Sequence, residues 1–98
     1  MKEQGIQKKI LNMLEKDFGA YVVKVQVASK SGVPDIICCC RGVFIGIEVK
    51  KEETKGDTSP LQEYNLRKIK RAGGYAMVAT SKEQVEEFLN EILKSSSS

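Results

Sequence analysis

Three charged side chains on two neighbouring segments could do chemistry together. Asp35 opens one apolar segment, and Glu48 and Lys50 close the next. If these segments form a hairpin that turns at Arg41-Gly42, counting outwards in antiparallel register sets Asp35 directly opposite Glu48. Cross-strand neighbours have Cβ atoms roughly 4.5–5.5 Å apart. Because strand side chains alternate between faces, Lys50 shares the face of Glu48, and the three groups converge on one patch.

This patch favours metal-dependent hydrolysis. Two carboxylates held this close repel each other unless a positive charge lies between them. Oxygen ligands suit Mg²⁺ or Mn²⁺, and such an ion polarises a phosphoryl oxygen and lowers the pKa of bound water. The sequence contains no histidine, which excludes Ser-His and Cys-His triads and histidine-ligated zinc. The alternative interpretation of the same residues is a cross-strand salt bridge at a sheet end.

Two further polar residues lie on helical faces that are otherwise apolar. Glu3 lies in the apolar stripe of the first helical segment and is expected to point towards the sheet, where a charge needs a partner. The alternative is a first-turn glutamate favoured by the helix dipole. Gln62 lies on the apolar side of the second helical segment, and Ser59-x-x-Gln62 is also a capping box. A role as helix cap and a role in the site are compatible.

Hydrophobic spacing and turn residues predict the elements that would position these side chains. Together they give the order αβββαβα, an α/β domain with a mixed four-stranded sheet flanked by helices. The predicted elements are helix 3–18, strand 21–27, loop 28–34, strands 35–40 and 43–50, a charged mobile loop 51–58, helix 60–72, strand 75–80 and a helix that begins at 81.

Length and composition limit the organisation of the chain. With 98 residues, 41% of them hydrophobic, we expect a single compact domain over residues 1–94 and a disordered serine tail over 95–98. The longest apolar runs are of strand length and the N-terminus lacks the layout of a secretory signal, which predicts a cytoplasmic protein and no membrane partner. The consecutive Cys38, Cys39 and Cys40 lack the spacing of a zinc site and favour small buried residues in a reducing compartment.

Charge is distributed unevenly although the net charge is only +3. The last helical segment is acidic, whereas four basic residues crowd the second helical segment. This basic cluster either contacts DNA or forms a solvated helix face. The cluster consists of Arg67, Lys68, Lys70 and Arg71.

Three short motifs together resemble one nuclease family. They are Gly32-Val33-Pro34-Asp35, Ile47-Glu48-Val49-Lys50 and Ser59-Pro60-Leu61-Gln62. In combination, and with the inward Glu3, they resemble the VRR-NUC (virus-type replication-repair nuclease) family of the PD-(D/E)XK superfamily, whose core is restriction-endonuclease-like. The resemblance runs from Glu3 to Ala79. Stand-alone members of the family are similar to archaeal Holliday junction resolvases.

The resemblance implies roles for individual residues. Asp35, Glu48 and the main-chain carbonyl of Val49 would bind Mg²⁺ or Mn²⁺, with Glu3 completing the metal shell. Lys50 would be the catalytic lysine. Gln62 would support the catalytic strand and the attacking water. The loop before Asp35 would lie near the scissile strand, with DNA contacts from Lys30 and Ser31 and from the basic cluster.

The resemblance also implies a substrate and an assembly, with alternatives. Family members cut branched DNA as homodimers, and one domain with one site needs a two-fold partner to cut two strands symmetrically. A chain this short suits a bacterial or phage-infected cell. A nuclease-like fold that only binds DNA is the main alternative, although the full set of acids and lysine disfavours it. Sequence-specific restriction cleavage is also disfavoured, because little lies outside the core to read bases.

Overall fold

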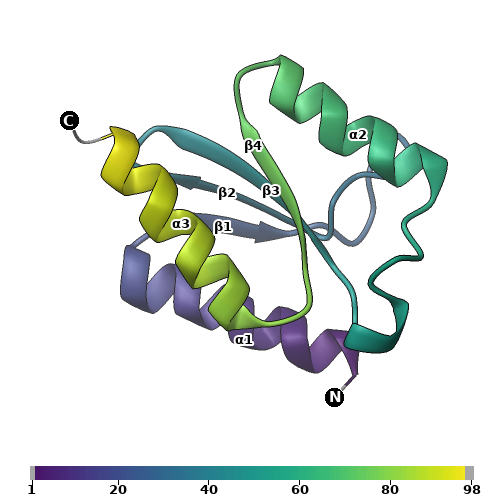
Figure 1. Cartoon of the computed structure of the whole chain (residues 1–98), viewed down its shortest axis with the longest axis horizontal. Helices are drawn as coiled ribbons and strands as arrows, with labels where there is room; N and C mark the ends of the chain where they lie inside the picture. Colours follow the sequence, from purple (N-terminus) through teal and green to yellow (C-terminus); the bar gives the residue numbers. More distant parts are fainter. Residues whose placement is uncertain (1, 97–98) are drawn as a thin grey trace.

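A four-stranded mixed sheet organises the chain, with helices on both of its faces (Figure 1). The computed structural model describes residues 2–96. The elements are α1 (Glu3–Phe18), β1 (Tyr21–Lys24), β2 (Ile36–Cys40), β3 (Val43–Val49), the short 3₁₀ turn η1 (Glu52–Thr54), α2 (Pro60–Arg71), β4 (Tyr75–Ala79) and α3 (Lys82–Ser96). The strand order is β1-β2-β3-β4, with the first two pairs antiparallel and the β3–β4 pair parallel. The predicted order αβββαβα is confirmed.

The β2–β3 hairpin has the predicted register. Its pairs run from Cys40 opposite Val43 to Ile36 opposite Ile47. Both turn residues have left-handed backbone conformations, with φ of 52° at Arg41 and 80° at Gly42, as a tight two-residue hairpin requires. One step beyond the last pair, Asp35 comes opposite Glu48.

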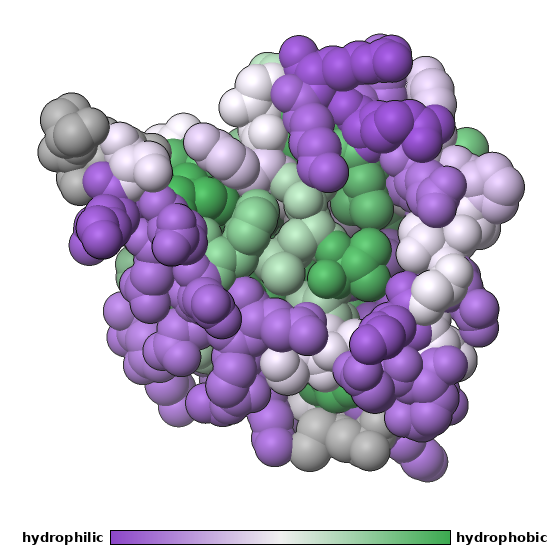
Figure 2. Space-filling view, viewed as in Figure 1, coloured by the Kyte–Doolittle hydropathy of each residue, from purple (hydrophilic) through white to green (hydrophobic). Residues whose placement is uncertain are grey.

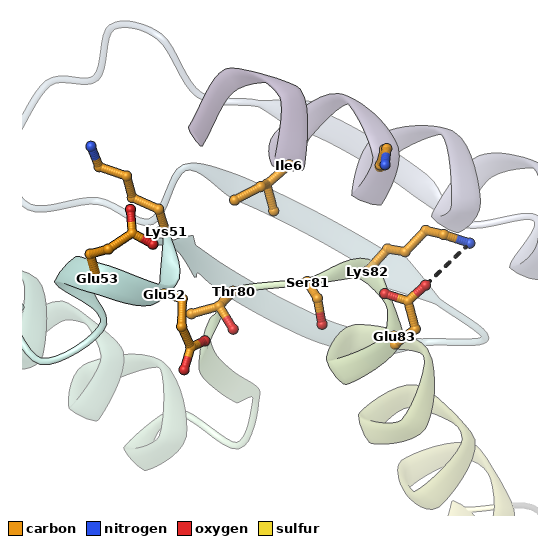
Figure 3. A pocket seen from close by; sticks show the side chains of 9 residues that line it. Ile6, Lys51, Glu52, Glu53, Thr80, Ser81, Lys82 and Glu83 are labelled. Carbon is orange, nitrogen blue, oxygen red and sulfur yellow. Dashed lines mark ion pairs between the residues drawn. The ribbon is translucent and has the colours of Figure 1, made fainter. Parts of the chain in front are cut away.

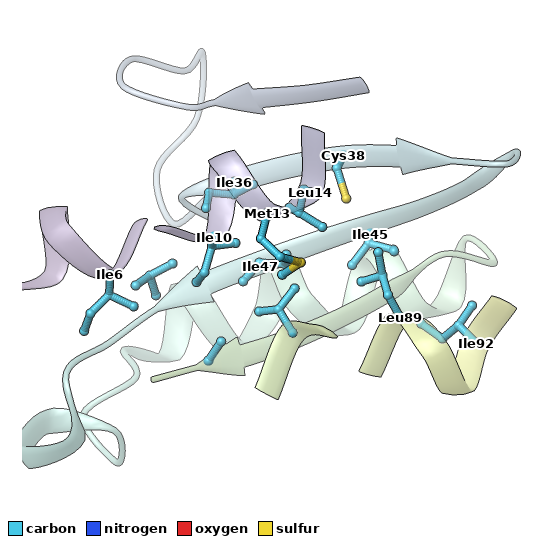
Figure 4. Packing of buried hydrophobic residues seen from close by; sticks show 13 residues of the cluster. Ile6, Ile10, Met13, Leu14, Ile36, Cys38, Ile45, Ile47, Leu89 and Ile92 are labelled. Atoms are coloured by element: carbon cyan, nitrogen blue, oxygen red, sulfur yellow. The ribbon is translucent and has the colours of Figure 1, made fainter. Parts of the chain in front are cut away.

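One face of the sheet forms the hydrophobic core with α1 and α3. Ile45, Ile47 and Val49 of β3 point to this face and are fully buried. They pack against residues of α1 and α3 that recur at helical spacing (Figure 4). The two helices also contact each other. The residues contributed by these helices include Ile6, Ile10, Met13, Leu14, Val85, Leu89 and Ile92.

The other face of the sheet is covered only in part. α2 contacts β3 and β4 but neither β1 nor β2. A Cβ atom on Gly46 of β3 would lie 2.7 Å from Cδ1 of Ile69 in α2, so glycine permits this close approach. The uncovered part, which we call the open sheet face, consists of exposed side chains on β1, β2 and β3: Tyr21, Val23, Cys39 and Phe44.

Several element bounds differ from the sequence prediction. β1 ends at Lys24 rather than at residue 27, although the Val25 N–H still donates to the Asp35 carbonyl at 2.8 Å. The predicted mobile loop 51–58 contains η1. α3 runs through Ser96, so it includes the first two serines of the predicted tail, and residues 97 and 98 lie outside the described residues. Within residues 2–96, no helix is both long and apolar enough to cross a membrane.

Candidate active site

Asp35 and Glu48 meet where β2 begins and β3 ends. Asp35 is half-buried, and its Oδ2 accepts a 2.8 Å hydrogen bond from the main-chain N–H of Val49. This bond links the strand ends beyond the last pair of the ladder and fixes the Asp35 carboxylate beside Glu48. Glu48 lies on the face of β3 that α2 covers, and only 3% of it is exposed.

Glu48 is a strongly perturbed acid. Burial is the largest cause, and the charge of Asp35 and a hydrogen bond with that carboxyl add to it, raising the pKa of Glu48 to about 8. The Lys50 charge acts in the opposite direction, and the Glu3 charge makes a small further contribution that raises the pKa. Such a carboxyl is short of positive charge, which is the electrostatic condition that favours a bound cation.

Lys50 and Gln62 complete the cluster around Glu48. Nζ of Lys50 lies 3.9 Å from Glu48 Oε2, and its side chain is only 14% exposed. The side-chain amide of Gln62 donates to the same oxygen at 2.9 Å. Gln62 also forms the predicted capping box, because its Oε1 accepts from the Ser59 N–H and its own N–H donates to Ser59 Oγ. Gln62 therefore serves both the helix start and the site.

The predicted metal shell is only partly assembled. Within residues 2–96 no three Asp, Glu, Cys or His side chains lie together in a way that could hold a metal ion. Asp35 and Glu48 form a pair, whereas Glu3 at the start of α1 is half-buried and does not join them as a third ligand. The carbonyl role of Val49 stays a prediction, since the contact that the structure gives to Val49 here uses its N–H.

The donor set nevertheless fits a hard divalent cation. Two adjacent carboxylates, one of them buried, are the oxygen ligands that Mg²⁺ and Mn²⁺ prefer. One helical turn after Glu3, Gln7 is 9% exposed and its Oε1 has no hydrogen-bond partner. A buried oxygen acceptor on the same helix face suits the hydration shell of a cation. Sequence reasoning missed Gln7, although its position four residues after Glu3 was a usable signal.

The cysteines take no part in the site. Cys38 and Cys40 are buried as predicted, whereas Cys39 points to the open sheet face and is exposed. Burial, together with the neighbouring thiols, raises the pKa of Cys38 to about 12, so this thiol stays protonated. It therefore offers neither a thiolate nucleophile nor a soft metal ligand.

The residues predicted to contact DNA lie at the surface. All four members of the basic cluster are exposed on α2, which presents a hydrophilic surface in Figure 2. Lys30 and Ser31 are exposed on the loop before Asp35. Lys30 and Lys68 line one groove of about 370 Å³, whose other walls include Val33, Pro34 and Phe44. The structure thus brings the loop and the basic helix to the same side of the molecule.

Asn65 is a second residue that sequence reasoning missed. It is 5% exposed on α2, one turn after Gln62, and its side-chain amide donates to the carbonyls of Ser31 at 3.1 Å and Leu61 at 2.9 Å. The usable signal was the spacing of two amide residues at i and i+3, which places both on one helix face. Asn65 therefore joins the loop before Asp35 to the helix that holds Gln62.

A separate pocket of about 200 Å³ lies beyond the ends of β3 and β4 (Figure 3). Its lining includes both lysines and glutamates, and Lys82 pairs with Glu83 at 3.7 Å. Hydrogen bonds from Lys55 and Thr80 lower the pKa of Glu52 at its rim. None of Asp35, Glu48, Lys50 and Gln62 lines this pocket, so it is distinct from the carboxylate cluster.

Comparison with known proteins shows the family and the fold of the chain. The sequence matches the family described as archaeal Holliday junction resolvase (Hjc) over residues 2–96. A solved structure described as "VRR_NUC domain" is 30% identical, with a TM-score of 0.74 over 90% of this chain and 94% of the other. A second, "VRR_NUC domain protein", is 19% identical with a TM-score of 0.72, over 96% of this chain and 89% of the other. A search of curated proteins gave no match.

Proposed function

The chain belongs to the archaeal Holliday junction resolvase family, whose members are nucleases, and from this premise we propose that it is a Mg²⁺- or Mn²⁺-dependent endonuclease for branched DNA. Four-way junctions are the proposed substrate, and a phosphodiester bond is hydrolysed. The observation that carries the proposal is buried Glu48, which is flanked by Asp35, Lys50 and Gln62. We further propose that it acts in the cytoplasm of a bacterial or phage-infected cell.

Asp35 and Glu48 would hold the metal ion, together with the Val49 carbonyl and Glu3. A bound divalent ion supplies Lewis-acid chemistry, since it polarises a phosphoryl oxygen and lowers the pKa of water. Glu3 would have to move towards this pair to join it, and its charge already acts on the Glu48 carboxyl. Gln7, one turn further along the helix, would accept a hydrogen bond from water at the site.

The other side chains bind and orient the reacting groups. The Lys50 ammonium lies at the edge of the cluster, where its charge would stabilise the negative charge that develops on the scissile phosphate. Gln62 donates to Glu48 Oε2 and so leaves the other carboxylate oxygen for the cation. The Val49 N–H holds Asp35 in one orientation before substrate arrives.

DNA would approach along α2 and the loop before Asp35. The basic cluster and Lys30 are exposed and offer positive charge to the phosphate backbone, which carries no sequence information directly. Recognition of DNA shape at a branch fits this surface better than recognition of a sequence.

The proposed active unit is a homodimer. Residues 2–96 hold one pair of the kind that Asp35 and Glu48 form, whereas symmetric cutting of two strands needs two such pairs related by a two-fold axis. The open sheet face would bury against its copy, because its Tyr21 is 74%, its Phe44 41% and its Val23 40% exposed. Grouped apolar side chains of this kind mark interaction surfaces.

Replacing Val23 by glutamate tests this assembly. We expect Val23→Glu to shift the protein from dimer to monomer in size-exclusion chromatography with light scattering, because a two-fold interface would bring two buried charges together. Val27→Glu is the matched control, since Val27 is 94% exposed in the loop after the same strand. A dimer that survives Val23→Glu would exclude the open sheet face as the interface.

Cleavage of defined DNA forms tests the proposed function. Labelled four-way junction, flap, linear duplex and single-stranded DNA are incubated with Mg²⁺, Mn²⁺ or EDTA, for the wild type and for Asp35→Ala. The expected result is paired, metal-dependent cuts in the junction that Asp35→Ala abolishes.

The remaining outcomes separate the alternatives. Preference for a flap or a single strand would retain the active-site residues and replace the substrate. Salt-sensitive binding without cleavage in either metal would favour the DNA-binding module, in which the basic cluster binds phosphates and the carboxylates do no chemistry.

A further inference from the structure

The loop that precedes Asp35 is fastened to α2 at one place. Residues 26–31 are exposed, and the chain re-enters the structure through Gly32 and the buried Pro34. At that point both amide hydrogens of Asn65 are used, one on the carbonyl of Ser31 and one on the carbonyl of Leu61 in its own helix. Because Asn65 is only 5% exposed, water does not compete effectively for these bonds.

Gly32 fits against the same turn of α2. Its φ is +80°, and a Cβ atom there would lie 2.8 Å from the main-chain carbon and oxygen of Leu61 and 2.9 Å from Nδ2 of Asn65. The loop backbone thus packs directly on the helix backbone, in a conformation that residues with a side chain rarely adopt. The hydrogen bond and the glycine contact fix the same short stretch of loop from two sides.

α2 therefore contacts two different parts of the site with one face of its first turns. Gln62 bonds the catalytic carboxylate of Glu48, and Asn65 bonds the loop that carries Lys30 and Ser31. Asp35 has independent anchors, since its carboxylate accepts from the Val49 N–H and its carbonyl from the Val25 N–H. Loss of the Asn65 bond would free the loop upstream of Asp35 while leaving the carboxylate pair in place.

We propose that Asn65 is a positioning residue for DNA, which holds the Lys30–Ser31 loop against α2 so that loop and basic helix form one binding surface. The inference deepens the proposed function and rests on it. It assigns Asn65 to substrate binding rather than to the metal site. The groove that Lys30 and Lys68 line together is the surface that this contact maintains.

Two replacements of Asn65 remove the contact in different ways. Asn65→Leu keeps the volume and removes both donors. Asn65→Ser keeps a hydroxyl that can donate to the carbonyl four residues earlier, but it is too short to bridge to Ser31. We expect both variants to raise the KM for junction DNA, and the Kd for the same DNA in EDTA, about tenfold, the cost of one lost buried hydrogen bond. The expected affinity for Mn²⁺, titrated calorimetrically without DNA, stays within about twofold of the wild type.

Gly32→Ala provides a second test of the loop position, and Asn12→Leu provides the control. In Gly32→Ala the added Cβ would meet the Leu61 backbone and push the loop away from α2. We expect this variant to raise the KM by a similar factor. When it is combined with Asn65→Leu, the two effects should be less than additive. Asn12 is exposed on α1, so Asn12→Leu is the matched control and should leave the KM and the Kd for junction DNA unchanged.

Each outcome decides the inference. An unchanged Kd and KM in the Asn65 variants would overturn it, and so would a parallel loss of Mn²⁺ affinity, which indicates a general structural role. If wild-type protein binds the junction without cutting it, the proposed function fails, while the ratio of Kd values between wild type and Asn65→Leu still tests the positioning role.

Discussion

Replacing Lys50 by alanine is expected to lower junction cleavage at least about a hundredfold while leaving DNA binding nearly intact. The Lys50 side chain is 14% exposed and lies 3.9 Å from Glu48 Oε2, at the edge of the carboxylate cluster rather than on the outer DNA surface. A preorganised charge at such a position acts mainly on charge that develops during the reaction, and removing one typically costs two to three orders of magnitude in rate. The measurement is single-turnover cleavage of a labelled four-way junction.

The neighbouring lysine supplies the control for Lys50. Lys51 is exposed at the next position, so Lys51→Ala removes the same formal charge from the chain without touching the cluster. Its expected effect is a small, salt-dependent loss of binding. Because Lys50 lowers the pKa of Glu48, cleavage by Lys50→Ala should be measured at saturating Mn²⁺. A Lys50→Ala rate within a few-fold of the wild type would remove Lys50 from the catalytic residues.

Replacing Glu48 by glutamine is expected to stabilise the fold and abolish cleavage. The pKa of Glu48 is raised from 4.5 to about 8 in the folded chain. A carboxyl with a raised pKa contributes its full stability below pH 4.5 and loses it as the pH rises to about 8. Glutamine resembles the protonated acid, since it can accept from Gln62 and donate to Asp35, but it does not ionise. In EDTA, the variant should therefore gain a few kcal/mol over the wild type at pH 8 and almost nothing at pH 4.

Urea unfolding in EDTA from pH 4 to pH 8.5 measures this difference in the free energy of unfolding. Glu86→Gln is the control, because Glu86 is exposed on α3. Adding Mg²⁺ should stabilise the wild type and not Glu48→Gln, since only a ligand that binds the folded state raises its stability. A difference between wild type and Glu48→Gln that does not vary with pH would show that Glu48 ionises freely.

The parts of the fold that follow from local pattern were predictable. The apolar spacing of α1 gives its bounds, and the Arg41-Gly42 turn fixes the hairpin register and hence the meeting of Asp35 with Glu48. Because side chains along a strand alternate with a period of two, the turn fixes which residues of the two strands pair. It therefore also fixes which side chains share each face of the hairpin. The same turn requires a positive φ at Arg41, which the residue type alone does not predict.

The parts that depend on packing between elements were less accessible. In α2 and at its C-cap the apolar Leu61 and Ala72 are exposed, whereas the polar Asn65 is buried. A buried asparagine looks like a surface residue until its partner, the Ser31 carbonyl, is known from the tertiary structure. Likewise, β1 stops at Lys24 although its alternating pattern continues to Val27. The last β1–β2 pair is Lys24 with Ile36, and beyond it the Val25 N–H bonds the Asp35 carbonyl before residues 26–31 continue as an exposed loop.

The two hydrogen bonds made by the Gln62 side chain limit which residue types position 62 can accept. A capping box accepts glutamate or glutamine, and a helix start evolving alone could drift between them. Here Oε1 serves the Ser59 N–H while the amide nitrogen donates to Glu48. Glutamate would serve the helix equally well but would place a third carboxylate against a buried acid that already lacks positive charge. The start of α2 and the end of β3 therefore share one side chain, so replacing Gln62 by glutamate would keep the cap and disturb Glu48.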